Sequence, residues 1–221
     1  EAAGYETLRG TGLSRTLYSE NLEAVEKASE IYAAHKDNVA TIPADIRPIV
    51  LNNEIKTSNS AELVASYMDT YVKTSLQELK RELAAAVANV RDEAAIKGLL
   101  EDFKNADIVK PQDIAFSWFY LLAKDFAQDA AWTWERENWD WIAEKLGGDM
   151  SYDKFVIYPG NVFKTAEKFE EYKAFFEPKL SNPGLKRSIE MAIKQIDARV
   201  SLINNQKSAV EAAIANVEKE L

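Results

Sequence analysis

The single histidine, His35, is the first candidate for chemistry in this chain. A two-histidine zinc site needs a second imidazole, and the chain has neither a His-Glu-x-x-His segment nor a cysteine to supply other ligands. His35 ends a run of helix-forming residues, and a cationic or donor side chain is favourable at a helix C-terminus. We therefore interpret His35 as a helix-end residue, and we predict no catalytic, cofactor-binding or metal-ligating residue in this chain.

Glycines and acidic residues give no stronger signal. The Gly10-Thr11-Gly12 segment lacks the third glycine and the preceding strand of a dinucleotide site, so it predicts a loop or a helix end. Catalytic acid pairs require one desolvated carboxyl group, and nothing in the local pattern predicts burial, so solvated helix faces are the preferred interpretation. The clustered acids are Glu135, Glu137, Asp140 and Glu144.

Four of the five tryptophans fall within ten residues, at Trp132, Trp134, Trp139 and Trp141. Helical spacing places Trp134, Asn138 and Trp141 on one face. Aromatic stripes at this spacing are usually buried, so the pattern favours an aromatic core over a surface that stacks on a ligand. A polar Asn138 within such a core requires hydrogen-bond partners, and we expect backbone carbonyls or helix ends.

Composition excludes several classes of partner. The net charge of -9 and the pI of about 4.9 predict repulsion of a phosphate backbone, so we expect no nucleic acid. The longest apolar stretch, residues 114–123, is far shorter than the roughly 20 residues of a membrane span. The lack of cysteine and of Asn-x-Ser/Thr segments favours a cytoplasmic location. A first residue of Glu1 indicates a piece of a longer protein.

Glycine and proline are rare and lie between periodic segments, which predicts an all-α chain. The expected helices cover residues 19–35, 43–56, 92–103, 111–124, 127–146, 152–157, 165–176 and 183–217. Two more are expected between residue 58 and residue 90: one is capped by Ser58 or Ser60 and runs to residue 71, and the other starts at Thr74 or Ser75 and runs to residue 90. We expect a kink or a break at Pro48. Short connections make consecutive helices antiparallel. We predict one domain, residues 1–221, of stacked antiparallel helical hairpins in a superhelical solenoid of the HEAT or armadillo type, closed by one long C-terminal helix.

The predicted last helix carries apolar residues at steps of mostly three and four. A coiled coil is the second interpretation, but Lys207 interrupts the apolar seam, which favours packing of this helix across the end of the helical stack. The apolar positions are Leu185, Ile189, Ala192, Ile196, Val200, Ile203, Val210, Ile214 and Val217.

Ordered segments between residues 22 and 211 resemble the C-terminal helical domain of the aminopeptidase N family of zinc peptidases. Pro111 stands where relatives carry a polar residue, and residues 147–161 do not align with the family pattern. The segments are Ile42–Arg47, similar to an Ala-Asp-Leu-Arg turn; Val109–Asp113, similar to a basic-x-Gln-Asp segment; Ala131–Trp141 with its Asn138-Trp139; and Phe175-Phe176 followed by Arg187 and Glu190.

The resemblance implies a non-catalytic domain that caps the active-site cleft of a zinc metalloaminopeptidase and gates or sizes its peptide substrates. The family's His-Glu-x-x-His and Gly-x-Met-Glu-Asn motifs have no counterpart here, so zinc and the catalytic residues are expected in a catalytic domain of the same polypeptide. We interpret Arg47, Arg187 and Arg199, at family-like positions, as links between helices. The alternatives are a helical-repeat scaffold that binds a protein on its concave face and a coiled-coil adaptor built on the last helix.

Overall fold

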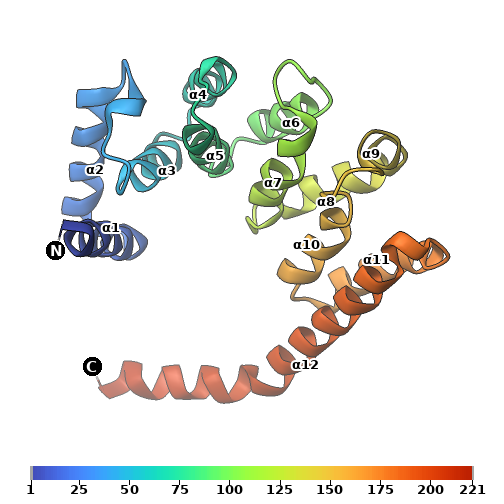
Figure 1. Ribbon diagram of the computed structural model, residues 1–221. Coiled ribbons are helices and arrows are strands. Elements are labelled where there is room, and N and C mark those ends of the chain that lie inside the picture. The colour runs from blue at the N-terminus through green and yellow to red at the C-terminus, as the bar shows by residue number, and fades with distance from the viewer. Residues whose placement is uncertain (1, 221) are drawn as a thin grey trace. The chain divides into compact units, whose positions relative to one another are not determined.

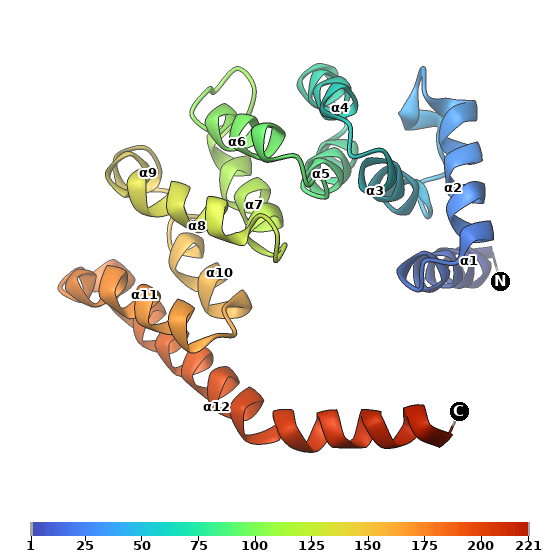
Figure 2. The ribbon, with the colours of Figure 1, turned by 180° about the vertical axis from the view of Figure 1, so that it is seen from behind.

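The structure, a computed structural model, describes the backbone of residues 2–220 and the side chains of residues 10–217. Every regular element within these residues is a helix, which confirms the predicted all-α class (Figure 1 and Figure 2). The elements are α1 (Ala2–Tyr18), α2 (Leu22–His35), η1 (Val39–Thr41), α3 (Arg47–Ser58), α4 (Ala61–Lys73), α5 (Gln77–Val87), α6 (Glu93–Asp102), α7 (Pro111–Leu122), α8 (Gln128–Glu137), α9 (Trp139–Leu146), α10 (Lys154–Val162), α11 (Ala166–Phe176), η2 (Glu177–Lys179) and α12 (Pro183–Glu220).

Side-chain caps fix several of the helix starts. The Ser60 hydroxyl accepts a hydrogen bond from the Leu63 amide at 3.2 Å, so Ser60 and not Ser58 begins α4. Asp92 begins α6 in the same way, through the Ala95 amide at 2.8 Å. Asn59 ends α3 in the left-handed conformation, with φ of 46°, which asparagine tolerates better than most residues. These caps satisfy amides and carbonyls that a helix end leaves without partners.

Several predicted boundaries near the N-terminus are wrong. Helix α1 was not expected, and the Gly10-Thr11-Gly12 segment lies inside it and is neither a loop nor a helix end. Gly10 allows α1 to pack closely against the turn at residues 44–46, because a Cβ atom on Gly10 would lie 3.0 Å from the Asp45 carbonyl oxygen. The helix predicted from residue 19 begins at Leu22. The helix predicted over residues 43–56 begins only at Arg47, so its predicted start is wrong; Pro48 lies in the first turn of α3 and does not kink or break a helix.

The helix predicted over residues 127–146 is also wrong, because the segment forms two helices, α8 and α9. The break is at Asn138, whose φ of -111° and ψ of 14° are not helical. Asparagine readily leaves the helical conformation, since its short polar side chain competes for backbone hydrogen bonds. Its amide donates to the Trp134 carbonyl at 2.7 Å, which confirms the expectation of a backbone carbonyl partner.

The chain divides into two compact units, residues 1–131 and 132–221. In the first unit, α3 packs against α2 and α5, and α5 packs against α4 and α7. Leu51, Leu83 and Trp118 are fully buried between these helices, and the Trp118 indole donates to the Ala131 carbonyl at 2.9 Å. The single-domain and solenoid descriptions remain predictions.

An ion pair of two buried side chains ties α3 to α5. The Arg47 guanidinium donates to both carboxylate oxygens of Glu82, and neither residue is more than 8% exposed. Arg47 also donates to the Ala40 and Ile42 carbonyls, at 3.3 and 3.4 Å. The pKa of Arg47 is raised, first by its hydrogen bond to Glu82. The Ile42–Arg47 segment therefore ends on a residue that holds two helices and a loop together, which confirms the linking role expected of Arg47.

The second unit is built on the first half of α12, which packs against α10 and α11. At the crossing with α10, a Cβ atom on Gly160 would lie 2.7 Å from the Ala192 Cβ, so this position requires a glycine. Arg199 donates to the Gly160 and Phe163 carbonyls at the end of α10, at 2.9 and 2.7 Å, which confirms its linking role. Arg187 is exposed.

The second half of α12 departs from the prediction that the whole helix packs across a helical stack. Ile189 and Ile196 are fully buried, and Val200 is 8% exposed. Every described side chain from Ser201 to Val217 is exposed. Figure 1 and Figure 2 both show α12 continuing past α10 and α11. The prediction is therefore correct for the first half of the helix and wrong, within the described residues, for the second half.

Candidate functional site

The first unit has a polar groove of about 220 Å³ between α1, α3 and the end of α5. We call it the amide groove, because Asn52, Asn53 and Asn89 supply side-chain amides to its lining, beside Lys56 and Ser14. Asn52, Asn53 and Lys56 project from consecutive turns of α3, and Asn89 follows the last turn of α5. Amide side chains carry both hydrogen-bond donors and acceptors, so such a lining suits a ligand with a polar backbone.

A line of hydrogen bonds runs beside the amide groove. The Lys124 ammonium donates to the Asn89 side-chain oxygen at 2.7 Å, and the Asn89 amide donates to the Asn52 side-chain oxygen at 3.1 Å. Burial lowers the pKa of Lys124, but an ammonium still carries three donors. The Asn53 amide nitrogen is buried without a partner. The Lys56 ammonium already donates to the Glu20 carboxylate at 3.0 Å, so Asn53 supplies the unpartnered donor, and a complementary ligand would present a carbonyl or carboxylate oxygen.

A second groove, also about 220 Å³, lies between α4, α5 and α7. Lys80 and Arg81 supply two positive charges from α5, and Asp113 supplies one negative charge from α7. The Lys80 ammonium lies 4.8 Å from the centre of the Tyr71 ring, and the Tyr71 hydroxyl is 3.4 Å from the Asp113 carboxylate. Burial, followed by the Asp113 charge, raises the pKa of Tyr71, so its hydroxyl stays protonated. This groove can bind polar groups, but it contains no activated nucleophile.

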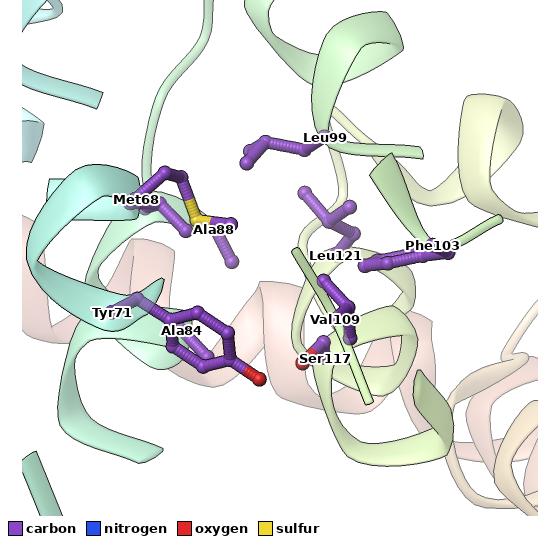
Figure 3. Close-up of a pocket in the computed structure, with 10 residues that line it drawn as sticks. Met68, Tyr71, Ala84, Ala88, Leu99, Phe103, Val109, Ser117 and Leu121 are labelled. Carbon is purple, nitrogen blue, oxygen red and sulfur yellow. The ribbon is translucent and has the colours of Figure 1, made fainter. Parts of the chain in front are cut away.

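A third hollow lies between α4, α5, α6 and α7, and Figure 3 shows the side chains that surround it. Its volume is about 20 Å³, close to the space of one water molecule. Met68, Leu99, Phe103 and Leu121 make its wall apolar, with Ser117 as a polar neighbour. An apolar space of this size is a packing gap and not a ligand site.

The tryptophans form an aromatic core in the second unit, as predicted. Trp132 is fully buried, and Trp134 and Trp139 are less than 10% exposed. The Trp132 indole donates to the Glu171 carboxylate at 2.8 Å, and its ring lies 5.2 Å from that of Phe163 in an edge-to-face arrangement. Edge-to-face contacts of this kind add to the stabilisation from burial alone.

Glu135 is the exception among the four clustered acids. Glu137, Asp140 and Glu144 are exposed, as expected, but Glu135 is fully buried and both of its carboxylate oxygens lack a hydrogen-bond partner. Burial raises its pKa well above the ordinary value, although the charges of Lys179 and Arg136 oppose the shift. The only signal that could have predicted the burial of Glu135 is its position between Trp134 and Trp139, both of which are buried.

The remaining residues that could do chemistry do not form a site. His35 is the last residue of α2, and its Nδ1 atom lies 2.7 Å from the Thr41 hydroxyl. Within residues 10–217, no three His, Cys, Asp or Glu side chains are grouped closely enough to hold a metal ion, so these residues do not fit a zinc site. In the same part of the chain, no helix is both long enough and apolar enough to cross a membrane. The grooves can bind through hydrogen bonds and charge.

Comparison with known proteins identifies the family. A family model described as the ERAP1-like C-terminal domain matches residues 3–198. The chain belongs to this family. It is also 72% identical, over all 221 residues, to the C-terminal region of Aminopeptidase N from Lactococcus lactis subsp. cremoris (strain MG1363). Aminopeptidase N from Lactobacillus helveticus is 44% identical over 94% of this chain, and Glutamyl aminopeptidase from Mus musculus is 23% identical over 88%.

The ERAP1-like C-terminal domain accounts for only part of these relatives. The chain spans 26% of the Lactococcus protein, 25% of the Lactobacillus protein and 21% of the mouse protein. The predicted resemblance to the aminopeptidase N family is therefore confirmed, and the chain is a C-terminal domain of that family. Segments such as Ile42–Arg47 and Ala131–Trp141, on which the resemblance was based, lie within the matched residues.

Proposed function

We propose that this chain is the non-catalytic C-terminal domain of a zinc-dependent aminopeptidase, and that it caps the active-site cleft and gates or sizes peptide substrates. The observation that carries the proposal is the match at 72% identity to about a quarter of a protein named Aminopeptidase N. The other three-quarters of such a protein would hold the zinc ion, the catalytic residues and the site for the substrate's amino terminus. That catalytic domain is the proposed partner of this chain, in the cytoplasm.

A cap of this kind controls the access of substrates to the active site and does not itself cleave bonds. Closing a cleft excludes water from the reaction and restricts the size of the chains that enter. The exposed polar grooves of the first unit support this role, because they can contact a peptide without any catalytic group of their own. We propose that the amide groove contacts the main-chain carbonyls of longer substrates, since its amide side chains can donate hydrogen bonds and the Asn53 amide nitrogen has no partner.

The parent activity is tested with the full-length protein. Purified full-length protein should hydrolyse an aminoacyl anilide, lose that activity when a chelator removes zinc, and regain it when zinc is returned. Hydrolysis that survives complete zinc removal would refute the zinc-dependent assignment. A full-length protein with no aminopeptidase activity in the zinc-loaded form would refute the parent function.

The gating role is tested with groove variants of the same protein. Asn52→Leu and Lys56→Met remove polar groups from the amide groove, while Lys97→Met changes an exposed lysine on α6 and serves as the matched control. Loss of one or two hydrogen bonds should raise KM for a peptide of eight to ten residues by about three- to tenfold. KM and kcat for the aminoacyl anilide should not change. Equal effects on the long and the short substrate would contradict a contact beyond the reaction centre.

A further inference from the structure

The second half of α12 presents an apolar face that nothing in the second unit covers. We call it the α12 stripe, made of Leu202, Ile203, Val210, Ile214 and Val217. These side chains are between 37% and 61% exposed. Single exposed apolar residues are common on protein surfaces, but they are usually scattered and do not form a line. A contiguous apolar line of this kind marks an interaction surface.

The α12 stripe continues the face that the first half of the helix already buries. Ile196, Ile203, Val210 and Val217 follow one another at intervals of seven residues, about two helical turns, so they lie on nearly the same side. Ile196 is fully buried in the second unit, and the three that follow it are exposed. A single apolar face therefore runs from the packed half of the helix into the uncovered half.

The stripe follows the residues that the family model matches. The family model ends at residue 198, before the first residue of the stripe. The match to the Lactococcus protein continues through residue 221, and that protein is about four times as long as this chain. The stripe therefore lies beyond the residues that the family model matches, but within the residues that match the Lactococcus protein.

We propose that the α12 stripe packs against the preceding portion of the same polypeptide, in an apolar groove with a charged rim, and so fastens the C-terminal domain to the catalytic part. This inference rests on the proposed function, because it requires the longer parent protein. Lys207 interrupts the stripe along one edge, and its ammonium lies 3.9 Å from the Glu211 carboxylate, so this ion pair suits a polar rim on that side. The apolar side chains of the stripe would occupy the centre.

A second copy of the chain fits the stripe less well. A stable interface between separate molecules buries about 800 Å² on each partner, and five side chains that are already partly covered offer on the order of half of that. Coiled coils need about three to four heptads of apolar seam, but here Lys207 occupies a seam position within a much shorter run. A partner in the same polypeptide needs less contact area, because its effective concentration is already high.

Thiol labelling of the full-length protein tests whether the stripe is covered. Val210→Cys places a thiol on the stripe, and Ala212→Cys places one on the opposite face of the same helix as the matched control. Labelling is measured for each cysteine-containing peptide by mass spectrometry, so thiols elsewhere do not interfere. The stripe position should react at least about tenfold more slowly than the control position. Equal and fast labelling at both positions would overturn the proposal.

A photo-crosslinking residue at position 210 of the full-length protein then identifies what covers the stripe. The expected product joins position 210 to a peptide that precedes Glu1 in the same molecule. A crosslink between two copies, or to a peptide of residues 1–131, would overturn the proposal. The aminopeptidase activity of the same preparation is measured separately, so that an inactive protein with the expected crosslink refutes the proposed function and leaves the contact standing.

Discussion

Replacing Glu135 with glutamine removes a buried ionisable carboxyl group from the second unit. Glu135 is fully buried, its carboxylate oxygens accept no hydrogen bond, and its pKa is raised well above the ordinary value by burial. The charges that oppose this shift come from Lys179 and Arg136, and neither side chain forms an ion pair with it at hydrogen-bond distance. Glu135→Gln keeps the shape of the side chain and stays neutral at every pH.

The direction of the effect follows from proton linkage. Between the pKa of the unfolded chain and the raised pKa of the folded protein, the folded state holds one proton more than the unfolded state, so the free energy of unfolding falls as the pH rises. One proton corresponds to a slope of at most about 1.4 kcal/mol per pH unit. The stability contributed by protonated Glu135 is fully present below the unfolded pKa and is lost as the pH rises through the folded pKa.

Urea denaturation at a series of pH values from 5 to 8, followed by tryptophan emission, measures this slope. The free energy of unfolding of Glu135→Gln minus that of the wild-type chain should increase with pH, by up to about 1.4 kcal/mol per unit, before it levels off. Glu137→Gln, an exposed position on the same helix, should run parallel to the wild type. Parallel curves for Glu135→Gln and the wild type would refute the assignment of a raised pKa to this carboxyl group.

Three further substitutions test the packing of the two units, each by urea denaturation. Arg47→Met leaves the Glu82 carboxylate buried without its partner and should cost about 3–5 kcal/mol, and removing Glu82 as well should recover most of that loss; additive losses would contradict the pairing. Gly160→Ala places a methyl group against Ala192 and should cost about 1–3 kcal/mol despite the better helix propensity of alanine, and a stabilised variant would show that the crossing has room. Ser60→Ala removes the α4 cap and should cost about 1 kcal/mol; an unchanged urea midpoint would mean that water replaces the hydroxyl.

Sequence periodicity predicted most of the helices, because each has an apolar face and is bounded by capping residues, glycine or proline. It predicted the helix that begins near Pro111 and the long helix after Asn182, where proline at the first helical position restricts the backbone. It missed α1, whose residues lack a clear apolar stripe, and the Asn138 break, where a single polar residue interrupts an otherwise helical pattern. Tertiary packing decides such positions, and periodicity does not report it.

The candidate site was harder to predict than the fold. The lack of a zinc motif follows from one histidine and no cysteine, and it could be read from composition alone. The amide groove could not be read in this way, because Asn52 and Asn89 are 37 residues apart and meet only when α3 and α5 pack together. Glu82 was also missed, since its role depends on Arg47 from another helix. Pairs of this kind carry no periodic signal in a single sequence.

The boundary between the two compact units falls inside α8, with no linker between them. The Ala131 carbonyl accepts a hydrogen bond from the Trp118 indole in the first unit, whereas the neighbouring Trp132 indole donates one to the Glu171 carboxylate in the second. Protein engineering that treats the units as exchangeable modules would therefore cut through a helix and separate two adjacent anchors. The exposed connection after α9, at Gly148, is a better place to insert a tag or to open a permuted chain, although it lies within the second unit.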